Sequence, residues 1–161
     1  MQVFVAEPCG FCYGVKRAVD MARGECGKET HAATLGPLIH NPQLTAELAA
    51  GGVSCCDDSL DSFEKGDTVI FRSHGVGPEV YAAAEEKGLN IIDATCPHVR
   101  AAQLKAKKLA DEGYFVIIIG EKNHPEVKSI SAWAGKNAII VEYNKDIAGI
   151  PVADKYGVTI Q

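Results

Sequence analysis

Two cysteines of the sequence lie where a helix is expected to begin. Cys12 precedes Tyr13 and Cys96 precedes Pro97, so each thiol is expected between a strand and the helix that follows it. Backbone N–H groups and the helix dipole at such a turn favour a thiolate over a thiol. Converging thiolates suit a soft metal centre, either zinc or an iron–sulfur cluster. Two ligands are too few for either centre, so Cys12 and Cys96 are candidates within a larger set.

Three histidines, His40, His74 and His124, come just after expected strands. Open α/β sheets form their ligand crevices at the carboxyl ends of strands. Imidazolium groups that converge there can donate charge-assisted hydrogen bonds to a phosphate, which predicts an anion site. Glu126 follows His124 by two residues and should open a helix. Its carboxylate could simply complement the helix dipole, or it could donate a proton beside an anion-binding histidine.

The other cysteines carry weaker signals. Cys9 and Cys12 form a single CxxC pair, which without a second pair is not specific for zinc or for redox chemistry. We expect Cys9 to be a bystander. Cys55 and Cys56 are adjacent on a short strand and Cys26 lies near a helix end, so all three are expected to be packing residues.

Short β-branched runs alternate with amphipathic segments along the chain. Strands are expected at Val3–Ala6, Ala32–Leu35, Val53–Cys55, Thr68–Arg72, Asn90–Asp93, Phe115–Ile119 and Ala138–Val141. Helices are expected at Tyr13–Cys26, Pro42–Ala50, Pro78–Lys87, Pro97–Glu112 and Pro125–Ala134. This alternation predicts an α/β fold with mainly parallel sheets in three α/β/α layers.

The sequence also repeats itself at one offset. Residues of the same type lie 84 positions apart (96 − 12, 120 − 36 and 124 − 40) at Cys12 and Cys96, Gly36 and Gly120, and His40 and His124. Duplicated units explain three matches in the same order. We therefore predict a first α/β unit over residues 1–95, with Cys12, His40 and His74, and a second over 96–155, with Cys96, His124 and Glu126.

Composition limits the classes of protein that are possible. The 161 residues are 47% hydrophobic and 23% charged, with six cysteines and a net charge of −5. No signal peptide or membrane span is expected, so the default location is the cytoplasm, where thiols stay reduced. The acidic balance argues against non-specific nucleic-acid binding.

Five segments resemble the LytB-type 4-hydroxy-3-methylbut-2-enyl diphosphate reductases in order and approximate spacing. They are Gly10-Phe11-Cys12-Tyr13-Gly14-Val15, Gly36-Pro37-Leu38-Ile39-His40-Asn41, Arg72-Ser73-His74-Gly75-Val76, Asp93-Ala94-Thr95-Cys96-Pro97 and Asn123-His124-Pro125-Glu126-Val127. The resemblance covers the chain from Gly10 to about Val127. Cys9 and the Lys128-Ser129 pair are local departures from the family pattern.

The resemblance implies an iron–sulfur enzyme of the non-mevalonate isoprenoid pathway. In that family three α/β domains surround a four-iron four-sulfur cluster held by three cysteines, of which Cys12 and Cys96 would be two. The third cysteine has no counterpart in this sequence. The chain thus resembles the amino-terminal two of the three domains, with residues 156–161 as the start of a truncated third unit, and so an incomplete catalytic unit.

The implied reaction converts 4-hydroxy-3-methylbut-2-enyl diphosphate to isopentenyl and dimethylallyl diphosphates by reductive dehydroxylation. By resemblance, Glu126 supplies a proton, while His40, His74 and His124 hold the diphosphate. Electrons would come from a ferredoxin- or flavodoxin-like donor. Two alternatives stay open: a non-catalytic anion-binding fragment of two domains, and a small zinc protein that uses Cys9, Cys12 and Cys96.

Overall fold

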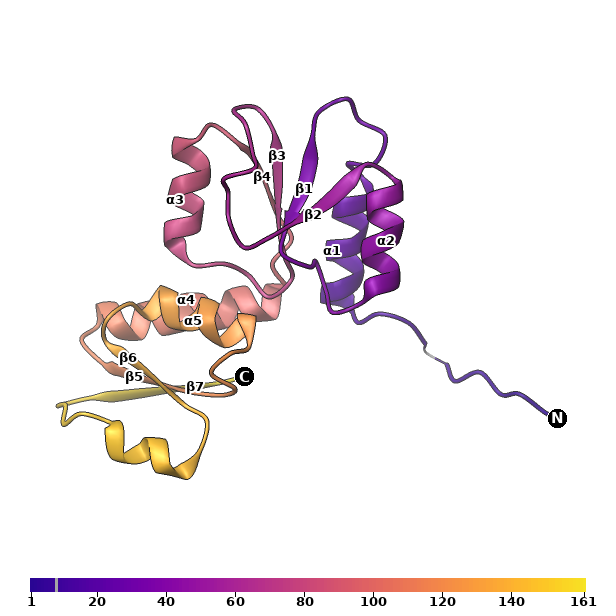
Figure 1. The fold of residues 1–161 in the computed structure, drawn as a ribbon. Coiled ribbons are helices and arrows are strands. Elements are labelled where there is room, and N and C mark those ends of the chain that lie inside the picture. Colours follow the sequence, from indigo (N-terminus) through magenta and orange to yellow (C-terminus); the bar gives the residue numbers. More distant parts are fainter. Residues whose placement is uncertain (8) are drawn as a thin grey trace.

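A computed structural model describes residues 1–7 and 9–161, and its first sheet contains four parallel strands (Figure 1). Their spatial order is β2-β1-β3-β4. The bounds are β1 Ala32–Leu35, β2 Val53–Cys56, β3 Thr68–Phe71 and β4 Asn90–Asp93. All four residues of both β1 and β3 are buried, as is typical of central strands in a parallel sheet.

Helices cover both faces of this first sheet. Helices α1 (Tyr13–Arg23) and α2 (Pro42–Ala50) pack on the face that includes Ala32 and Ile70. Helix α3 (Pro78–Glu86) packs on the opposite face, which includes Ala33 and Phe71. Because successive strand residues point to opposite faces, the fully buried strands β1 and β3 supply both cores. The first unit therefore has the expected three layers.

The second sheet has three parallel strands in the order β6-β5-β7. Its strands are β5 Phe115–Ile119, β6 Ala138–Val141 and β7 Tyr156–Ile160. Helices α4 (Pro97–Asp111) and α5 (Pro125–Ala134) share one core with the β5 residues Val116 and Ile118. The other face of β5 is less covered: Ile119 is 40% exposed, and the short 3₁₀ helix η1 (Asn144–Gly149) follows β6.

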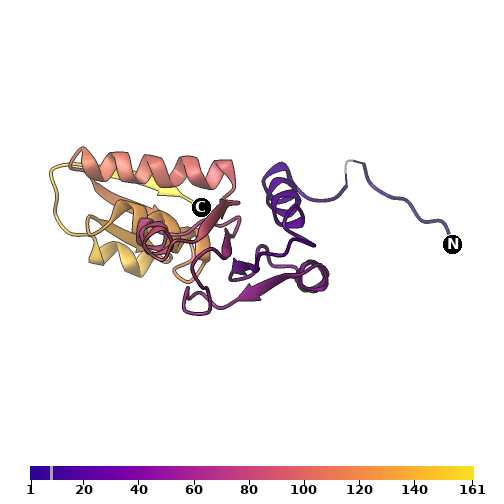
Figure 2. The same cartoon turned by 90° about the horizontal axis from the view of Figure 1, so that it is seen from above.

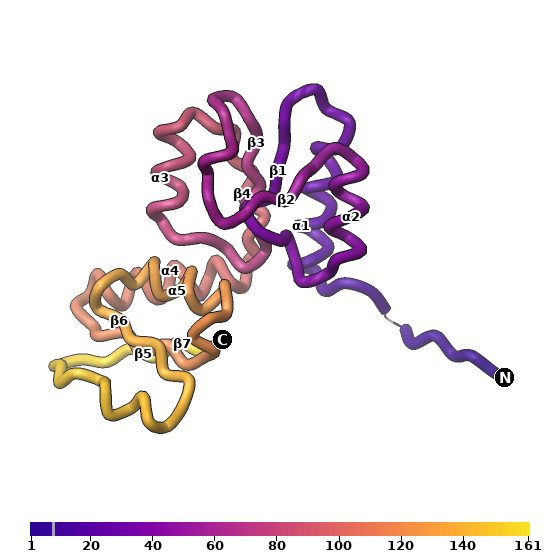
Figure 3. The backbone as a smooth tube through the Cα atoms, viewed as in Figure 1, coloured from indigo at the N-terminus to yellow at the C-terminus, as the bar shows by residue number. Residues whose placement is uncertain are grey.

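The two sheets share one connectivity, as the repeat predicts (Figure 3). The order α1-β1-α2-β2-β3 in the first unit corresponds to α4-β5-α5-β6-β7 in the second. In each sheet the first strand lies between the next two, with parallel pairing on both sides. The chain crosses from one sheet to the other through residues 94–96 and α4, where the predicted boundary falls.

The prediction that residues 156–161 open a third unit is wrong. Strand β7 pairs with β5 over Phe115–Ile119, so it completes the second sheet. Gly157 lets β7 lie close to α4, because a Cβ at this position would lie 2.7 Å from Leu109 Cδ1 on that helix. By its position β7 corresponds to β3 of the first unit.

The expected strand at Val3–Ala6 is also wrong. These residues form no strand, and Figures 1 and 2 show the segment running away from the body of the molecule. Phe4 is 87% exposed and Val5 is 75% exposed, so β-branched and aromatic content alone did not decide their structure. A strand requires a neighbouring edge to pair with, and this segment lies beside none of the described strands.

The α/β class with parallel sheets is confirmed, and the remaining elements end within three residues of their predicted limits. Four of the five α-helices begin with the expected proline, at Pro42, Pro78, Pro97 and Pro125. Among the described residues, no helix has the length and apolar character that crossing a membrane requires.

Candidate functional site

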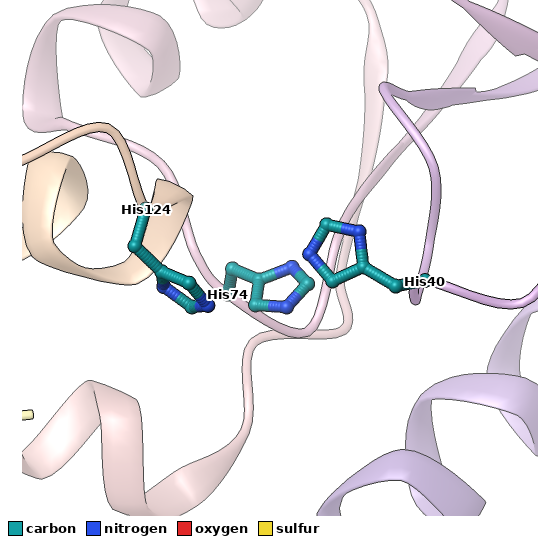
Figure 4. Close-up of side chains that lie close together, drawn as sticks. All are labelled: His40, His74 and His124. Atoms are coloured by element: carbon teal, nitrogen blue, oxygen red, sulfur yellow. The ribbon is translucent and has the colours of Figure 1, made fainter. Parts of the chain in front are cut away.

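His40, His74 and His124 converge from three loops. One ring nitrogen of each lies within 4.8 Å of the others, and Figure 4 shows the His74 ring between the other two. The ring centroids of His40 and His74 are 4.8 Å apart, and those of His74 and His124 are 5.4 Å apart. The loops follow β1, β3 and β5, so each histidine comes from the carboxyl end of a parallel strand, as predicted.

A buried serine joins the His40 and His74 loops. Ser73 is 6% exposed, and its Oγ donates a hydrogen bond of 3.0 Å to the carbonyl oxygen of Leu38, two residues before His40. The Ser73 backbone N–H donates to the same carbonyl at 3.2 Å. Both bonds hold the backbone before His40 against the backbone before His74.

Gly36 lets the His40 loop turn away from the end of β1. Its φ is +70°, a left-handed conformation that suits glycine. A Cβ at Gly36 would lie 2.5 Å from Arg72 Nη1 and 2.6 Å from Asp58 Oδ1. These two side chains form a salt bridge of 2.8 Å. The glycine therefore allows Arg72, two residues before His74, to pack under the turn.

His74 has an unusual protonation equilibrium. Burial, followed by the nearby positive charges of His40, His124 and Arg72, lowers the pKa of His74 from 6.5 to about 4. The ring is therefore neutral at neutral pH. Its Nδ1 atom is buried and has no hydrogen-bond partner among the described residues.

A backbone bond assigns the tautomer of His124. This residue is the N-cap of α5, and its Nδ1 accepts a hydrogen bond of 3.2 Å from the Glu126 N–H. Because Nδ1 is the acceptor, the proton of the neutral ring lies on Nε2. His124 therefore offers an N–H donor to a ligand.

This tautomer distinguishes two uses of the histidine cluster. Three neutral imidazoles at this spacing could in principle hold a metal ion, which needs a lone pair from each ring. The lone pair of His124 is already engaged with the Glu126 N–H, and its other nitrogen carries the proton. The arrangement consequently favours an anion that accepts hydrogen bonds over a metal ion that accepts lone pairs.

The two candidate cysteine ligands cap equivalent helices. Cys12 is the N-cap of α1 and Cys96 is the N-cap of α4. Only Cys96 follows a strand, because the expected strand before Cys12 does not form. Gly14 lies against Cys96, since a Cβ on Gly14 would be 2.5 Å from Cys96 Sγ. The first turn of α1 therefore reaches the Cys96 thiol.

Polar contacts hold this arrangement in place. Arg17 on α1 donates hydrogen bonds to the carbonyl oxygens of Thr95 (3.1 Å) and Asp93 (3.3 Å), on either side of Ala94. The Cys96 backbone N–H donates to the Ser73 carbonyl at 2.9 Å. Cys96 is thus tied both to α1 and to the loop that carries His74.

The other sequence candidates lie as follows. Glu126 is half-buried in the first turn of α5, two residues after His124. Cys9 is a free, exposed thiol. Among the described residues, the three histidines are the one group of metal-ligand type whose ligand atoms converge, and Cys9, Cys12 and Cys96 do not form such a group.

Sequence reasoning gave no role to Ser73, Gln103 or Ser129, although all three are buried at this site. One signal could have found Gln103. It lies between Val99 and Ala106 on the core-facing side of α4, where a polar residue needs a specific partner. No comparable pattern marks the two serines.

Comparisons with known proteins match nearly the whole chain. A family model described as LytB protein matches residues 3–161. The 4-hydroxy-3-methylbut-2-enyl diphosphate reductase of Pelobacter propionicus is 42% identical over the whole chain, which covers 57% of that protein. The enzyme of the same name from Aquifex aeolicus is 45% identical, again over the whole chain and 56% of the relative. The chain thus spans about half the length of the curated relatives that it matches.

Solved structures show the same likeness. A structure of (E)-4-hydroxy-3-methyl-but-2-enyl diphosphate reductase aligns with 99% of the chain at a TM-score of 0.86 and 42% identity. The E-1-hydroxy-2-methyl-but-2-enyl-4-diphosphate reductase of Plasmodium falciparum aligns with 96% of it at a TM-score of 0.90 and 29% identity. The chain covers 57% and 49% of these two structures, respectively.

Proposed function

The chain belongs to the LytB family, and from that premise we propose that it forms the diphosphate-binding part of a 4-hydroxy-3-methylbut-2-enyl diphosphate reductase. One observation carries the proposal: three imidazoles from three strand-end loops have ring nitrogens within 4.8 Å of one another. The reaction is reductive removal of the substrate hydroxyl to give isopentenyl and dimethylallyl diphosphates.

In this proposal His40, His74 and His124 bind the diphosphate through ring N–H groups. His124 donates through Nε2, because Nδ1 accepts from the Glu126 backbone. His74 enters the complex neutral, and a bound anion then favours its protonation, because opposite charge raises the pKa of an imidazole. A charge-assisted hydrogen bond to phosphate replaces the neutral one when that proton is taken up.

Cys12 and Cys96 fit two thiolate positions of a four-iron four-sulfur cluster. Both thiols are free, both cysteines occupy the N-cap position of a helix without a side-chain capping bond, and Gly14 leaves room for Cys96 Sγ beside α1. Such a cluster, when bound, supplies electrons and a Lewis-acidic iron. In this chain the two cysteines would hold it next to the His74 loop, since the Cys96 backbone bonds to Ser73.

Glu126 is the proposed proton donor. It shares the first turn of α5 with His124, which holds the Glu126 backbone N–H through Nδ1. Glu126 follows a proposed anion-binding histidine by two residues, and in this proposal its carboxyl group supplies the proton with which the substrate hydroxyl leaves as water. The alternative is that the Glu126 carboxylate only complements the helix dipole, in which case the loss of its proton would not change turnover.

The partners follow from the same proposal. Electrons would reach the cluster from a ferredoxin- or flavodoxin-like donor. Six free cysteines suit a reducing compartment, for which the cytoplasm is the proposed location.

The zinc alternative has less support, because Cys9, Cys12 and Cys96 do not converge among the described residues. Iron, sulfide and zinc analysis of anaerobically prepared protein separates the cluster, zinc and cofactor-free possibilities.

Calorimetric titration of this chain with inorganic pyrophosphate tests the anion site. Wild type should bind, and His40→Ala or His124→Ala should each weaken binding by about 10-fold to 150-fold, the cost of about 1.5–3 kcal/mol for a hydrogen bond to a charged group. Glu126→Gln should leave the affinity within about twofold, because the proposed role of Glu126 is proton transfer and not binding.

His31→Ala is the matched control for these histidine variants. His31 precedes β1 at the amino end of the sheet, and its Nδ1 lies 2.9 Å from Asp67 Oδ2. Its loss should therefore leave pyrophosphate affinity unchanged. Equal weakening by His31→Ala and His40→Ala, or no binding by wild type, would overturn the diphosphate site.

A further inference from the structure

Ser129 lies at the contact between the two units and touches the backbone of two proposed site residues. It is 4% exposed on α5. Its Oγ lies 2.9 Å from the His74 carbonyl oxygen and 2.8 Å from the Glu126 carbonyl oxygen. A hydroxyl has one proton, so it donates to one of these carbonyls at a time. The bond to His74 crosses from α5 to the loop after β3.

Gln103 orients this hydroxyl from a third element. Its side chain is fully buried on α4, and its Nε2 donates a hydrogen bond of 3.1 Å to Ser129 Oγ. Its Oε1 accepts from Arg100 Nη1 at 3.2 Å. Gly75 leaves the space that the amide needs, because a Cβ there would overlap Gln103 Nε2. The Gln103 amide donates to a lone pair of Ser129 Oγ, so the hydroxyl proton of Ser129 points toward the His74 and Glu126 carbonyls.

This chain of bonds joins the two halves of the histidine cluster. His40 and His74 come from loops of the first sheet, and His124 comes from the second. Ser73 connects the His40 loop to the His74 loop, but among the described residues none of its hydrogen bonds reaches α5. The bond between Ser129 and the carbonyl of His74 itself connects this loop to the helix that begins at His124.

We propose that Ser129, oriented by Gln103, is a positioning residue that fixes the His74 loop against α5 and so holds the three imidazoles ready for the diphosphate. The inference rests on the proposed function, since it assigns a role within the same site. Holding ligand-binding groups in place before binding raises affinity, because less conformational freedom is lost in the complex.

Pyrophosphate titration of Ser129→Ala tests the proposal. The change removes only the hydroxyl, so the fold should survive, and we expect binding about 5-fold to 10-fold weaker than wild type. Gln103→Met, which keeps the volume and removes the amide, should weaken binding to a similar extent. The double variant should have about the same pyrophosphate affinity as the weaker-binding of the two single variants. The effects should not add, because both changes break the same chain of hydrogen bonds.

Two controls on α5 separate positioning from general destabilisation. Ser131→Ala removes a hydroxyl on the same helix, and Ile130→Val removes one methyl group from the second core. Both should leave pyrophosphate affinity within about twofold, although Ile130→Val should lower the free energy of unfolding by about 0.5–1.5 kcal/mol. Equal weakening by these controls and by Ser129→Ala would overturn the positioning role.

Amide hydrogen exchange provides a readout that needs no ligand. In Ser129→Ala, amides of residues 73–77 should exchange faster, while those of β3 should exchange at the wild-type rate. If wild type failed to bind pyrophosphate, the proposed function would be lost, yet the exchange measurement would still decide the positioning role. Unchanged exchange at residues 73–77 would refute it.

Discussion

Burial of the His74 imidazole between two other histidines lowers the positive charge of the proposed anion site. Its pKa of about 4 leaves the His74 ring neutral at neutral pH, and the bond from the Glu126 N–H to His124 Nδ1 leaves Nε2–H as the donor of His124. The nearby Arg72 is already paired with Asp58 at 2.8 Å. A neutral His74 avoids placing an imidazolium charge between His40 and His124, and a bound anion would favour uptake of a proton by His74.

The low pKa of His74 predicts a pH dependence of stability. The unfolded histidine titrates near 6.5 and the folded one near 4, so the unfolded chain takes up the proton first as the pH falls. The free energy of unfolding should therefore decrease from about pH 6.5 toward pH 4 and should not depend on His74 above that range. Urea unfolding at pH about 7.5 and about 5 should show a smaller loss for His74→Asn than for wild type.

The comparison with His74→Asn isolates this histidine from the carboxylates. Hydrogen bonds from Lys122 and from the Tyr143 and Glu142 backbones hold the pKa of Asp146 at about 2, so its stabilising effect is lost only at still lower pH. Such carboxylates contribute equally to wild type and variant. Identical losses in the two proteins between these pH values would contradict the assigned pKa.

At the residue scale, the sequence predicted where the three histidines lie better than it predicted the protonation state of His74. Strand-end placement explains why His40 and His74 meet, because β1 and β3 are neighbours in one sheet and their carboxyl ends share an edge. His124 follows β5 of the second sheet, so its position also depends on the contact between the two units. The neutral state of His74 depends on burial and on charges from distant segments, which no local pattern encodes. The role of Ser129 likewise depends on a carbonyl 55 positions away in sequence.

At the scale of elements, helix and strand limits follow from local signals, whereas strand pairing does not. Proline at the first helical position and β-branched runs predicted most boundaries. Neither signal shows that Val3–Ala6 lacks a partner or that Tyr156–Ile160 pairs with β5. Parallel pairing joins segments far apart in sequence, so the same short apolar run can become a strand or stay unpaired.

The pairing of β7 predicts different effects of proline at two adjacent positions. The Gln161 N–H donates to the Ile119 carbonyl, and in a strand successive N–H groups alternate in direction. The N–H of Thr159 should therefore face β5, while that of Val158 faces the open edge of the sheet. Thr159→Pro removes a bond of the ladder and should lower the free energy of unfolding by about 1–3 kcal/mol more than Val158→Pro.

Urea unfolding of both proline variants, followed by far-UV circular dichroism, measures this difference. Val158→Pro is the control, because it introduces the same ring and the same loss of backbone freedom one residue away. Equal stabilities for the two variants would mean that β7 does not pair with β5 in the observed register.

At the scale of the whole molecule, the site depends on a contact between two units that each have a separate core. Trp133 of α5 donates from Nε1 to the Val76 carbonyl at 2.9 Å, one more bond to the loop after β3. The guanidinium of Arg100 lies 4.4 Å from the centre of the Trp133 ring and 5.3 Å from that of Tyr81. Arg100 of α4 therefore links α3 and α5 through the rings of Tyr81 and Trp133.

The single tryptophan of the chain makes this contact observable. Arg100→Met keeps most of the apolar stem but removes the cation from both rings, and should lower the free energy of unfolding by about 1 kcal/mol. Because the link between the units is weakened more than either core, the Trp133 fluorescence transition in urea should move to lower concentration than the circular dichroism transition. In wild type the two transitions should coincide.

Lys105→Met is the matched control, because it removes a positive charge from an exposed position of the same helix. In Lys105→Met the fluorescence and circular dichroism transitions should coincide, at the urea midpoint of wild type. If Arg100→Met also kept the transitions coincident and unshifted, the cation would not join the units. The convergence of His124 with His40 and His74 would then depend on the Ser129 and Trp133 hydrogen bonds without help from Arg100.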